Sequence, residues 1–351
     1  MNSVPSARNH GSAAQTHATH APTGASDART DAAPVVRDTP VDRDALAFRV
    51  EQSQAMQGVI FGLAAYLWWG VVPVYFKAVA AVPALEVLAH RVIWSVVLLG
   101  FLMRVFRRWP GALASLRDRM TLLTLVGSTT LIALNWLTFI WAVASGKLLQ
   151  ASLGYYINPL VNVLLGFVFL SERLRAWQWV SVGLAAVSVT YLTSTCGVFP
   201  WVALVLAVSF GFYGLLRKIV RLDSLSGLTL ETLILSPLMF GYWFWLMGRG
   251  DSAMQTGAAG VKWLLPLSGI VTAVPLLFFA GAARRLRLAT IGFLQYIAPT
   301  MHFTLAVAVF GESFTPAHAL CFAMIWIALT VYSIDAVLAS RRSRIAAPAP
   351  R

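Results

Sequence analysis

Ten apolar stretches, each about twenty residues long, fill most of the sequence between residues 57 and 338. A helix of that length crosses the hydrocarbon core of a bilayer and satisfies its own backbone hydrogen bonds where no water is present. The ten-residue alternating segments of a transmembrane β-barrel are absent from the sequence. The sequence therefore predicts an all-α integral membrane protein with ten transmembrane helices, near residues 57–77, 84–103, 122–144, 149–170, 176–194, 198–216, 227–246, 263–282, 288–310 and 317–337.

The composition and charge agree with this fold class. Hydrophobic residues make up 58% of the chain and charged residues only 12%. The net charge of +13 follows the helix boundaries, so it does not indicate a nucleic-acid partner. With a cytoplasmic N-terminus, the segments on the far side carry only Lys77, Lys147, Arg249 and Lys262, whereas the cytoplasmic segments are rich in arginine. The positive-inside rule then predicts that both termini are cytoplasmic, as an even number of helices requires.

The two ends of the chain differ from the apolar part. Residues 1–55 contain no long apolar stretch, so we expect a disordered cytoplasmic tail without a signal peptide. Met56 stands immediately before the first helix, where an alternative start could lie. Residues 341–351 form a basic cytoplasmic tail. Cys196 and Cys321 show no pairing or ligand pattern, so we expect no disulfide, no metal site and no cofactor.

An internal repeat links two distant parts of the chain. Residues 154–159 read Gly-Tyr-Tyr-Ile-Asn-Pro, and residues 294–299 read Leu-Gln-Tyr-Ile-Ala-Pro. A glutamate follows each proline at the same spacing, Glu172 in the first copy and Glu312 in the second. The offset of 140 residues corresponds to five helices, and an odd number of crossings inverts one copy relative to the other. We expect repeats at residues 56–195 and 196–340, with a binding site near the membrane midplane.

Ionisable residues inside predicted helices mark candidate functional positions. A charge at the bilayer centre is costly, so Arg91 and Glu231 each need a partner or a function. They are also 140 residues apart, and therefore occupy equivalent positions in the two repeats. We expect them to meet across the cavity as a gate or substrate-anchoring pair; a structural ion pair is the alternative.

Polar residues near the repeated motif extend this site. Tyr155, Asn158 and Asn162 share one helix face, and the helix-breaking Pro159 and Pro299 free backbone carbonyls. Interhelical hydrogen bonding with proline kinks is the alternative to cavity lining. The predicted substrate-binding or gating residues are Arg91, Glu231, Tyr155, Tyr156, Asn158, Asn162, Asn135, Gln295, Tyr296 and His302, and the candidates for proton coupling are Glu231, His302 and Glu86.

Distinctive polar and aromatic residues recur within the apolar runs: Trp69, Gly70, Pro73, Tyr75, Lys77, Glu86, His90, Arg91, Trp94, Ser95, Asn135, Trp136, residues 152–159, Gly214, Arg217, Lys218, Glu231, Thr232, Pro237 and residues 295–299. Over residues 57–338 this set resembles the RarD branch of the EamA-type drug/metabolite transporter superfamily. The resemblance implies ten helices in a five-plus-five inverted repeat, a bacterial inner-membrane location and a role as a small-molecule carrier or exporter. The chain departs from the pattern in its 55-residue tail and in Ala298, which replaces the asparagine of the first copy.

The function predicted from these features is secondary transport. We expect a non-enzymatic exporter of a small organic metabolite or drug-like compound, working by alternating access around the midplane cavity. The presence of Arg91 together with tyrosines and tryptophans suggests an amphiphilic substrate with an anionic or polar group. The coupling is either proton exchange or facilitated exchange. A lipid-processing or lipid-flipping membrane protein is the alternative function. The expected partners are the small-molecule substrate, the lipid bilayer and a second copy bound through the helices near 176–194 and 317–337.

Overall fold

The computed structural model of the chain describes residues 40–346, except residues 172, 198, 221 and 287. The chain divides into two compact units, Met1–Phe48 and Arg49–Arg351, and every membrane span lies in the second unit. Within the described residues all regular secondary structure is helical, and ten helices are long and apolar enough to cross a membrane. The predicted fold class is therefore confirmed.

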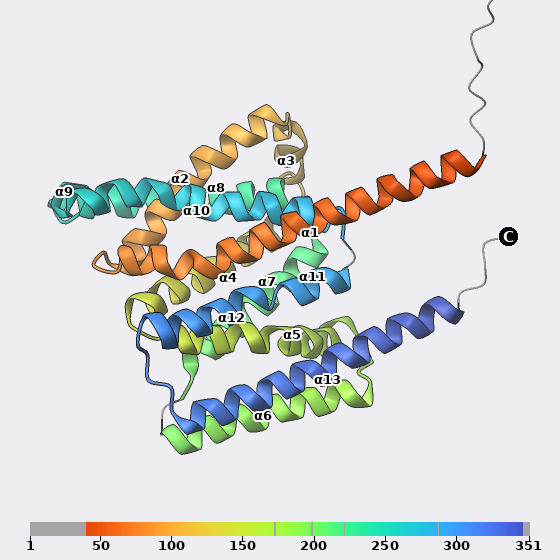
Figure 1. Ribbon diagram of the computed structural model, residues 1–351. Coiled ribbons are helices and arrows are strands. Elements are labelled where there is room, and N and C mark those ends of the chain that lie inside the picture. Colours follow the sequence, from red (N-terminus) through yellow and green to blue (C-terminus); the bar gives the residue numbers. More distant parts are fainter. Residues whose placement is uncertain (1–39, 172, 198, 221, 287, 347–351) are drawn as a thin grey trace, which may run out of the picture. The chain divides into compact units, whose positions relative to one another are not determined.

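The spans follow one another through short connections (Figure 1). Helices α3 (Trp109–Ser115) and α9 (Ala253–Thr256) are short connecting elements. The spanning elements are α1 (Pro40–Ala78), α2 (Ala84–Val105), α4 (Arg119–Ala144), α5 (Leu148–Leu170), α6 (Ala176–Cys196), α7 (Trp201–Ile219), α8 (Ser224–Arg249), α10 (Ala259–Ala283), a ninth span made of α11 (Leu288–Leu294), α12 (Ile297–Thr304) and the π-helical η1 (Leu305–Val309), and α13 (Pro316–Ala346).

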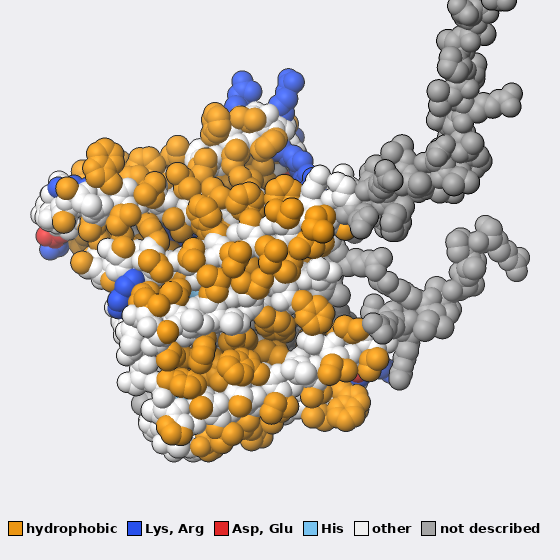
Figure 2. All heavy atoms as spheres, viewed as in Figure 1, with side chains coloured by type: hydrophobic (Ala, Val, Ile, Leu, Met, Phe, Trp, Pro, Cys, Tyr) orange, Lys and Arg blue, Asp and Glu red, His pale blue; other side chains and the backbone are white. Residues whose placement is uncertain are grey.

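Side-chain chemistry on the surface matches the predicted membrane environment. Hydrophobic side chains spread over the visible face of the spans, whereas the visible Lys and Arg side chains gather near helix ends (Figure 2). Large apolar side chains such as Phe101, Val97 and Ile327 are more than half exposed. In water such a surface would aggregate, but in a bilayer it is the expected contact with lipid.

The terminal helices extend further than the sequence predicted. Helix α1 begins at Pro40, so residues 40–55 are helical rather than disordered. They contain good helix formers and no glycine, and they continue an existing membrane helix without a new nucleation step. Helix α13 likewise reaches Ala346, inside the predicted basic tail. Residues 1–39 and 347–351 lie outside the described part of the chain.

Glycine contacts reveal the internal symmetry of the bundle. Gly70 of α1 lies so close to Met301 of α12 that a Cβ atom at this glycine would overlap the methionine side chain. Gly211 of α7 lies in the same way against Val161 of α5, with an added Cβ only 2.9 Å from the valine. Val161 and Met301 are 140 residues apart, and the two glycines differ by one residue from that offset. The first helix of each half therefore packs on the fourth helix of the other half in the same manner.

A second pair of equivalent contacts joins the same helices, but here the glycine lies on a different helix in each half. Gly154 of α5 faces the backbone of Ala203 on α7, where an added Cβ would lie 2.6 Å from the Ala203 carbonyl oxygen. In the other half, Gly62 of α1 faces Leu294 of α11, with an added Cβ 2.6 Å from the leucine side chain. The glycine thus lies on the fourth helix in one contact and on the first helix in the other, yet both crossings are close. These contacts support the predicted five-helix repeat.

The two copies of the repeated motif differ in backbone structure. Helix α5 continues through Pro159 without a break, whereas the ninth span is interrupted between Leu294 and Ile297 before Pro299. A π-helical segment then ends that span. Discontinuous and π-helical segments in membrane helices occur frequently at functional sites. Of the two spans that carry the repeated motif, the ninth span is therefore less regular than α5.

The close crossing at Gly154 gives a stability prediction. Gly154→Ala should destabilise the protein by about 1–3 kcal/mol, because the new methyl group meets backbone atoms of Ala203 that cannot rotate away. Gly183→Ala on α6, where an added Cβ meets nothing within 4 Å, is the matched control and should be neutral or slightly stabilising. Thermal unfolding of both purified variants in detergent checks this. Equal melting temperatures for the two variants would contradict the contact.

Candidate functional site

Arg91 on α2 is a cation held among aromatic rings inside the bundle. Its guanidinium carbon lies 4.2 Å from the ring centroid of Trp136 and 5.6 Å from that of Phe76. Its Nε atom is buried and has no hydrogen-bond acceptor. Among the described residues no carboxylate lies within ion-pair distance of this side chain. Arg91 therefore keeps an uncompensated positive charge with hydrogen-bond donors to spare.

A chain of aromatic contacts continues from Arg91 to His302. The ring centroids of Phe76 and Phe139 are 5.9 Å apart, and that of Phe139 is 5.7 Å from Tyr155 and 5.3 Å from His302. The Nε2 atom of His302 lies 3.0 Å from the Trp69 carbonyl oxygen. A carbonyl oxygen only accepts, so this nitrogen carries the proton. Nδ1 of the same ring is buried without a partner, and in the neutral ring it is a free acceptor.

Asn135 makes the hydrogen bonds that connect this aromatic cluster to neighbouring helices. Its side-chain amide nitrogen donates to the Leu206 carbonyl oxygen and to the Ser209 hydroxyl, each at 3.0 Å. Its side-chain oxygen accepts from the Tyr155 hydroxyl at 3.4 Å. These bonds tie α4 to α7 and orient the tyrosine ring on α5. The cluster containing Arg91, Trp136, Phe76, Phe139, Tyr155, Asn135 and His302 is called the arginine site below.

Glu231 does not belong to this site, and the predicted pairing with Arg91 is wrong. Its buried carboxylate accepts hydrogen bonds from Ser128 at 2.7 Å and Tyr213 at 3.2 Å. It also lies 3.9 Å from the Arg217 guanidinium. Sequence reasoning missed these three partners, although Tyr213 and Arg217 share an i, i+4 face of α7.

The inverted repeat explains why the predicted pair fails. Arg91 follows the first residue of α2 by seven positions, and Glu231 follows the first residue of α8 by seven positions. The two helices start at opposite faces of the membrane, because five crossings separate them. At 1.5 Å per residue each charge lies about 10 Å from its own face, which leaves about 10 Å of depth between them in a ~30 Å core. Equivalent positions in an inverted repeat meet only near the midplane.

Backbone geometry accommodates the cation beside Glu231. A Cβ atom on Gly227 of α8 would overlap the guanidinium of Arg217 in its present position, so a larger residue there would require the arginine side chain to shift. One terminal nitrogen of Arg217 is buried and has no hydrogen-bond acceptor. The Glu231–Arg217 contact is therefore a loose ion pair whose cation is not fully satisfied.

The other predicted residues divide between two sides of α5. Tyr156 points away from the arginine site, with its hydroxyl 2.7 Å from that of Thr300 and its ring stacked on Tyr296. Asn158 is buried with its side-chain oxygen unpartnered, whereas Asn162 is exposed. Gln295 is half-buried beside the break in the ninth span. Consecutive residues on a helix differ by about 100° in direction, which separates Tyr155 from Tyr156.

Two glutamates connect the repeats at the membrane face where α1 ends and α2 begins. Buried Glu86 accepts from the Ser252 hydroxyl at 2.8 Å and from the Ala253 backbone N–H at 2.7 Å. Glu312 accepts from the backbone N–H groups of Leu148 and Leu149 at 2.7 and 2.8 Å. The sequence pattern does not single out Glu312 as a site residue. The absence of a capping side chain at the start of α5 was an available signal, since the free N–H groups there need an acceptor.

Ten spans with equivalent contacts in two halves, enclosing polar residues, have the architecture of membrane carriers built from inverted repeats. Comparison with known proteins places the chain among transporters. Residues 56–194 match the model of the EamA-like transporter family. A chain of known crystal structure shares the fold, with a TM-score of 0.50 at 20% identity over 78% of this chain and 96% of that chain.

Curated relatives match over most of this chain and nearly all of their own length. An uncharacterized transporter of Vibrio cholerae is 47% identical, over 84% of this chain and 97% of its own length. Protein RarD of Escherichia coli is 45% identical, over 84% of this chain and 99% of its own. A chloramphenicol-sensitive protein RarD of Pseudomonas aeruginosa is 33% identical, over 82% and 96%. The chain belongs to the EamA-like transporter family, in its RarD-like branch, which confirms the resemblance found in the sequence.

Glu312 provides a test of the contact between the repeats. Glu312→Gln should lower the free energy of unfolding by about 1–2 kcal/mol, because a neutral amide has one acceptor oxygen for two N–H groups and loses its charge beside a helix N-terminus. Asp251→Asn removes an exposed ion pair with Arg249 and should cost less than about 0.5 kcal/mol. Chemical unfolding in detergent measures both values. Equal effects of the two substitutions would argue against the helix-capping role.

The separation of Arg91 from Glu231 can be measured by double-mutant cycles. The stability effects of Arg91→Gln and Glu231→Gln should add within about 0.5 kcal/mol, because the two side chains share no partner. The control pair, Ser128→Ala with Glu231→Gln, should show coupling above that level because these side chains are hydrogen-bonded. A coupling energy of more than about 1 kcal/mol between Arg91 and Glu231 would indicate that the two side chains do interact, as the sequence predicted.

Proposed function

We propose that the protein is a secondary carrier that exports an amphiphilic organic anion across a bacterial inner membrane, with both termini in the cytoplasm. The observation that carries the proposal is the uncompensated Arg91 guanidinium among aromatic rings. A charged side chain within a membrane span costs about 2.5–3.5 kcal/mol on insertion scales. A carboxylate or other anionic group on the substrate would offset that cost, and the guanidinium can bind it with two parallel hydrogen bonds.

The rest of the arginine site suits the body of such a substrate. The rings of Trp136, Phe76 and Phe139 offer apolar and stacking surface next to the cation. The unpartnered Nδ1 of His302 offers an acceptor on the far side of Phe139. Together they favour a compact molecule with an anionic end, an apolar or aromatic body and a hydrogen-bond donor. Asn135 and Tyr155 would then orient the substrate.

Alternating access requires contacts that open and close at the two membrane faces. We assign Glu86 with Ser252 and Ala253, and Glu312 with Leu148 and Leu149, to closure of the outer face, since each joins one repeat to the other. Glu231 with Ser128 joins the repeats in the inner half. Rocking of the repeats would break one set while the other forms.

Proton coupling through Glu231 or His302 is part of this proposal. Each is a buried titratable group within the spans, and each contacts a polar group on another helix. Glu86, the third candidate, serves better as a closing contact because its carboxylate is held by a backbone N–H. We also retain a homodimer through α6 and α13, whose outer faces carry exposed residues such as Trp177 and Ile327.

Transport in proteoliposomes tests the function directly. Proteoliposomes that contain the purified protein are loaded with a pooled library of organic anions and neutral metabolites. They should show saturable exchange with counterflow for a set of amphiphilic anions. Arg91→Gln should reduce that exchange at least about tenfold, and Arg91→Lys should restore part of it because the charge returns without the planar stacking surface. Arg249→Gln, at an exposed cation, is the matched control and should leave exchange unchanged.

Three results would count against the proposal. If no anion in the pool depended on Arg91, the substrate site would lie elsewhere. Linear flux without saturation or counterflow would indicate a channel. Chemical alteration of a transported compound would indicate an enzyme instead of a carrier.

A further inference from the structure

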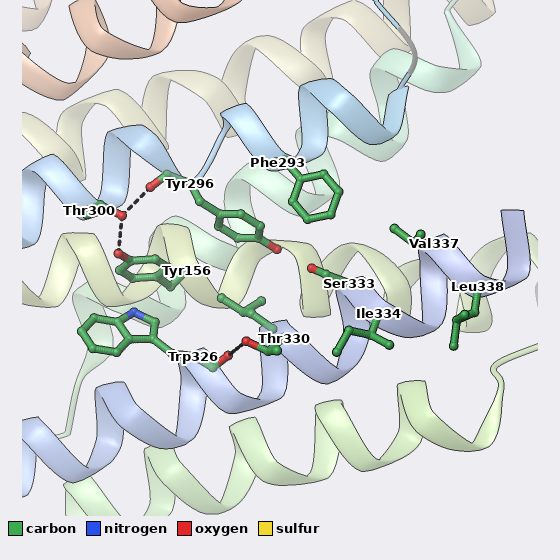
Figure 3. A pocket seen from close by; sticks show the side chains of 11 residues that line it. Tyr156, Phe293, Tyr296, Thr300, Trp326, Thr330, Ser333, Ile334, Val337 and Leu338 are labelled. Atoms are coloured by element: carbon green, nitrogen blue, oxygen red, sulfur yellow. Dashed lines mark hydrogen bonds between the residues drawn. The ribbon is translucent and has the colours of Figure 1, made fainter. Parts of the chain in front are cut away.

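A groove lies on a different side of α5 from the arginine site, the side that carries Tyr156. It is bounded by α5, the ninth span and α13, and it follows the break in the ninth span (Figure 3). Phe293 belongs to the last turn of α11, Tyr296 lies in the break itself and Thr300 lies in the first turn of α12. Ser333 and Trp326 line the groove from α13. All these residues lie within predicted membrane spans, so the groove opens at bilayer depth.

The broken helix puts an irregular backbone segment beside the groove. Pro299 has no N–H to donate to the carbonyl of Gln295, so the helical hydrogen-bond pattern is incomplete at the break. Irregular backbone at membrane depth is tolerated where it lies within protein or lines a cavity that holds polar groups. Because Tyr296 lines the groove, the irregular segment borders a cavity of this kind.

The side chains that line the groove indicate which kind of ligand it can bind. The rings of Tyr156 and Tyr296 stack with centroids 6.4 Å apart, and Trp326 packs against Tyr156. Hydroxyl groups come from Thr300 and Ser333, and the Tyr296 hydroxyl points toward Ser333 (Figure 3). None of the described lining residues carries a charge. An ion would enter this groove without a counter-charge, whereas an uncharged ring with a hydroxyl group finds both stacking surface and hydrogen-bond partners.

We propose that this groove is a second ligand site, which takes an uncharged aromatic amphiphile from the bilayer. It differs from the arginine site in charge, in access and in the face of α5 that lines it. The ring of the ligand lies against Phe293, Tyr296 and Trp326, and its polar group faces Thr300 and Ser333 beside the broken helix. The proposal does not depend on the nature of the transported substrate.

Photolabelling tests the site with a defined probe. The probe is benzyl alcohol carrying a trifluoromethyl-diazirine on its ring, added to the full-length protein in liposomes of phosphatidylethanolamine and phosphatidylglycerol. Mass spectrometry of the irradiated protein should locate saturable labelling on the peptides of α11–α12 and α13, and an excess of the same alcohol without the diazirine should abolish it. Ser333→Trp fills the groove and should reduce that labelling at least about tenfold.

Further variants separate a built site from general lipid contact. Thr300→Val removes a hydroxyl without filling the groove and should reduce labelling several-fold; the melting temperature should fall slightly, because that hydroxyl bonds to the Tyr156 hydroxyl and to the Tyr296 carbonyl. Ile270→Trp fills an apolar groove between α2 and α10, lined by Trp94 and Phe101, and should leave α13 labelling unchanged. The corresponding benzoate, which is anionic, should not label the α13 groove saturably.

Specific results would overturn the inference. Labelling of α13 that never saturates, or that equals the labelling of the α2–α10 groove, would show that bilayer lipid covers both surfaces alike. Saturable labelling that persists in Ser333→Trp and Thr300→Val would place the ligand elsewhere. Equal labelling by the alcohol and the benzoate would contradict the selection for an uncharged ligand. Because all these measurements are independent of Arg91 and of transport, they can fail while the carrier function holds.

Discussion

The inversion of one five-helix half relative to the other is the constraint on which this structure depends. Because an odd number of crossings separates the halves, a helix contact that occurs in both halves lies at opposite depths in the membrane. The crossings of Gly70 with Met301 and of Gly211 with Val161 follow this relation. The same relation separates Arg91 from Glu231, which lie about 10 Å from opposite membrane faces. Arg91 and Glu231 occupy equivalent positions in the two repeats, but they lie at different depths and therefore in different environments.

Those environments suit different tasks. Glu231 has hydroxyl donors and a nearby cation, so its charge is compensated within the protein. Arg91 has aromatic neighbours and no acidic partner among the described residues, so its charge remains available to a ligand. Glu86 and Glu312 bond instead to backbone N–H groups across the two halves. The proposed carrier function requires both, a site that binds substrate and contacts that close a face.

The sequence predicted the fold well and the site only in part. Apolar length alone located the ten spans, because a bilayer leaves few other structures for such runs. It also singled out Tyr155, Asn135 and His302, which the structure brings together, and Arg91, which reaches them through Phe76 and Phe139. It could not supply partners, because the direction of a side chain depends on helix rotation and depth. Tyr155 and Tyr156 are neighbours in sequence but face different sides of α5. The break in the ninth span was also hidden, since Pro159 occupies a continuous helix in the other copy.

The central claim is that the Arg91 guanidinium binds the anionic group of a substrate, and equilibrium binding tests it most directly. Calorimetric titration of the detergent-purified protein would compare an aromatic carboxylate found in the transport screen with its uncharged primary amide. We predict that the carboxylate binds the wild type at least about tenfold more tightly than the amide, and that Arg91→Gln binds both with equal, weak affinity. Equal affinity of the wild type for both compounds, or retained preference for the carboxylate in Arg91→Gln, would contradict the claim.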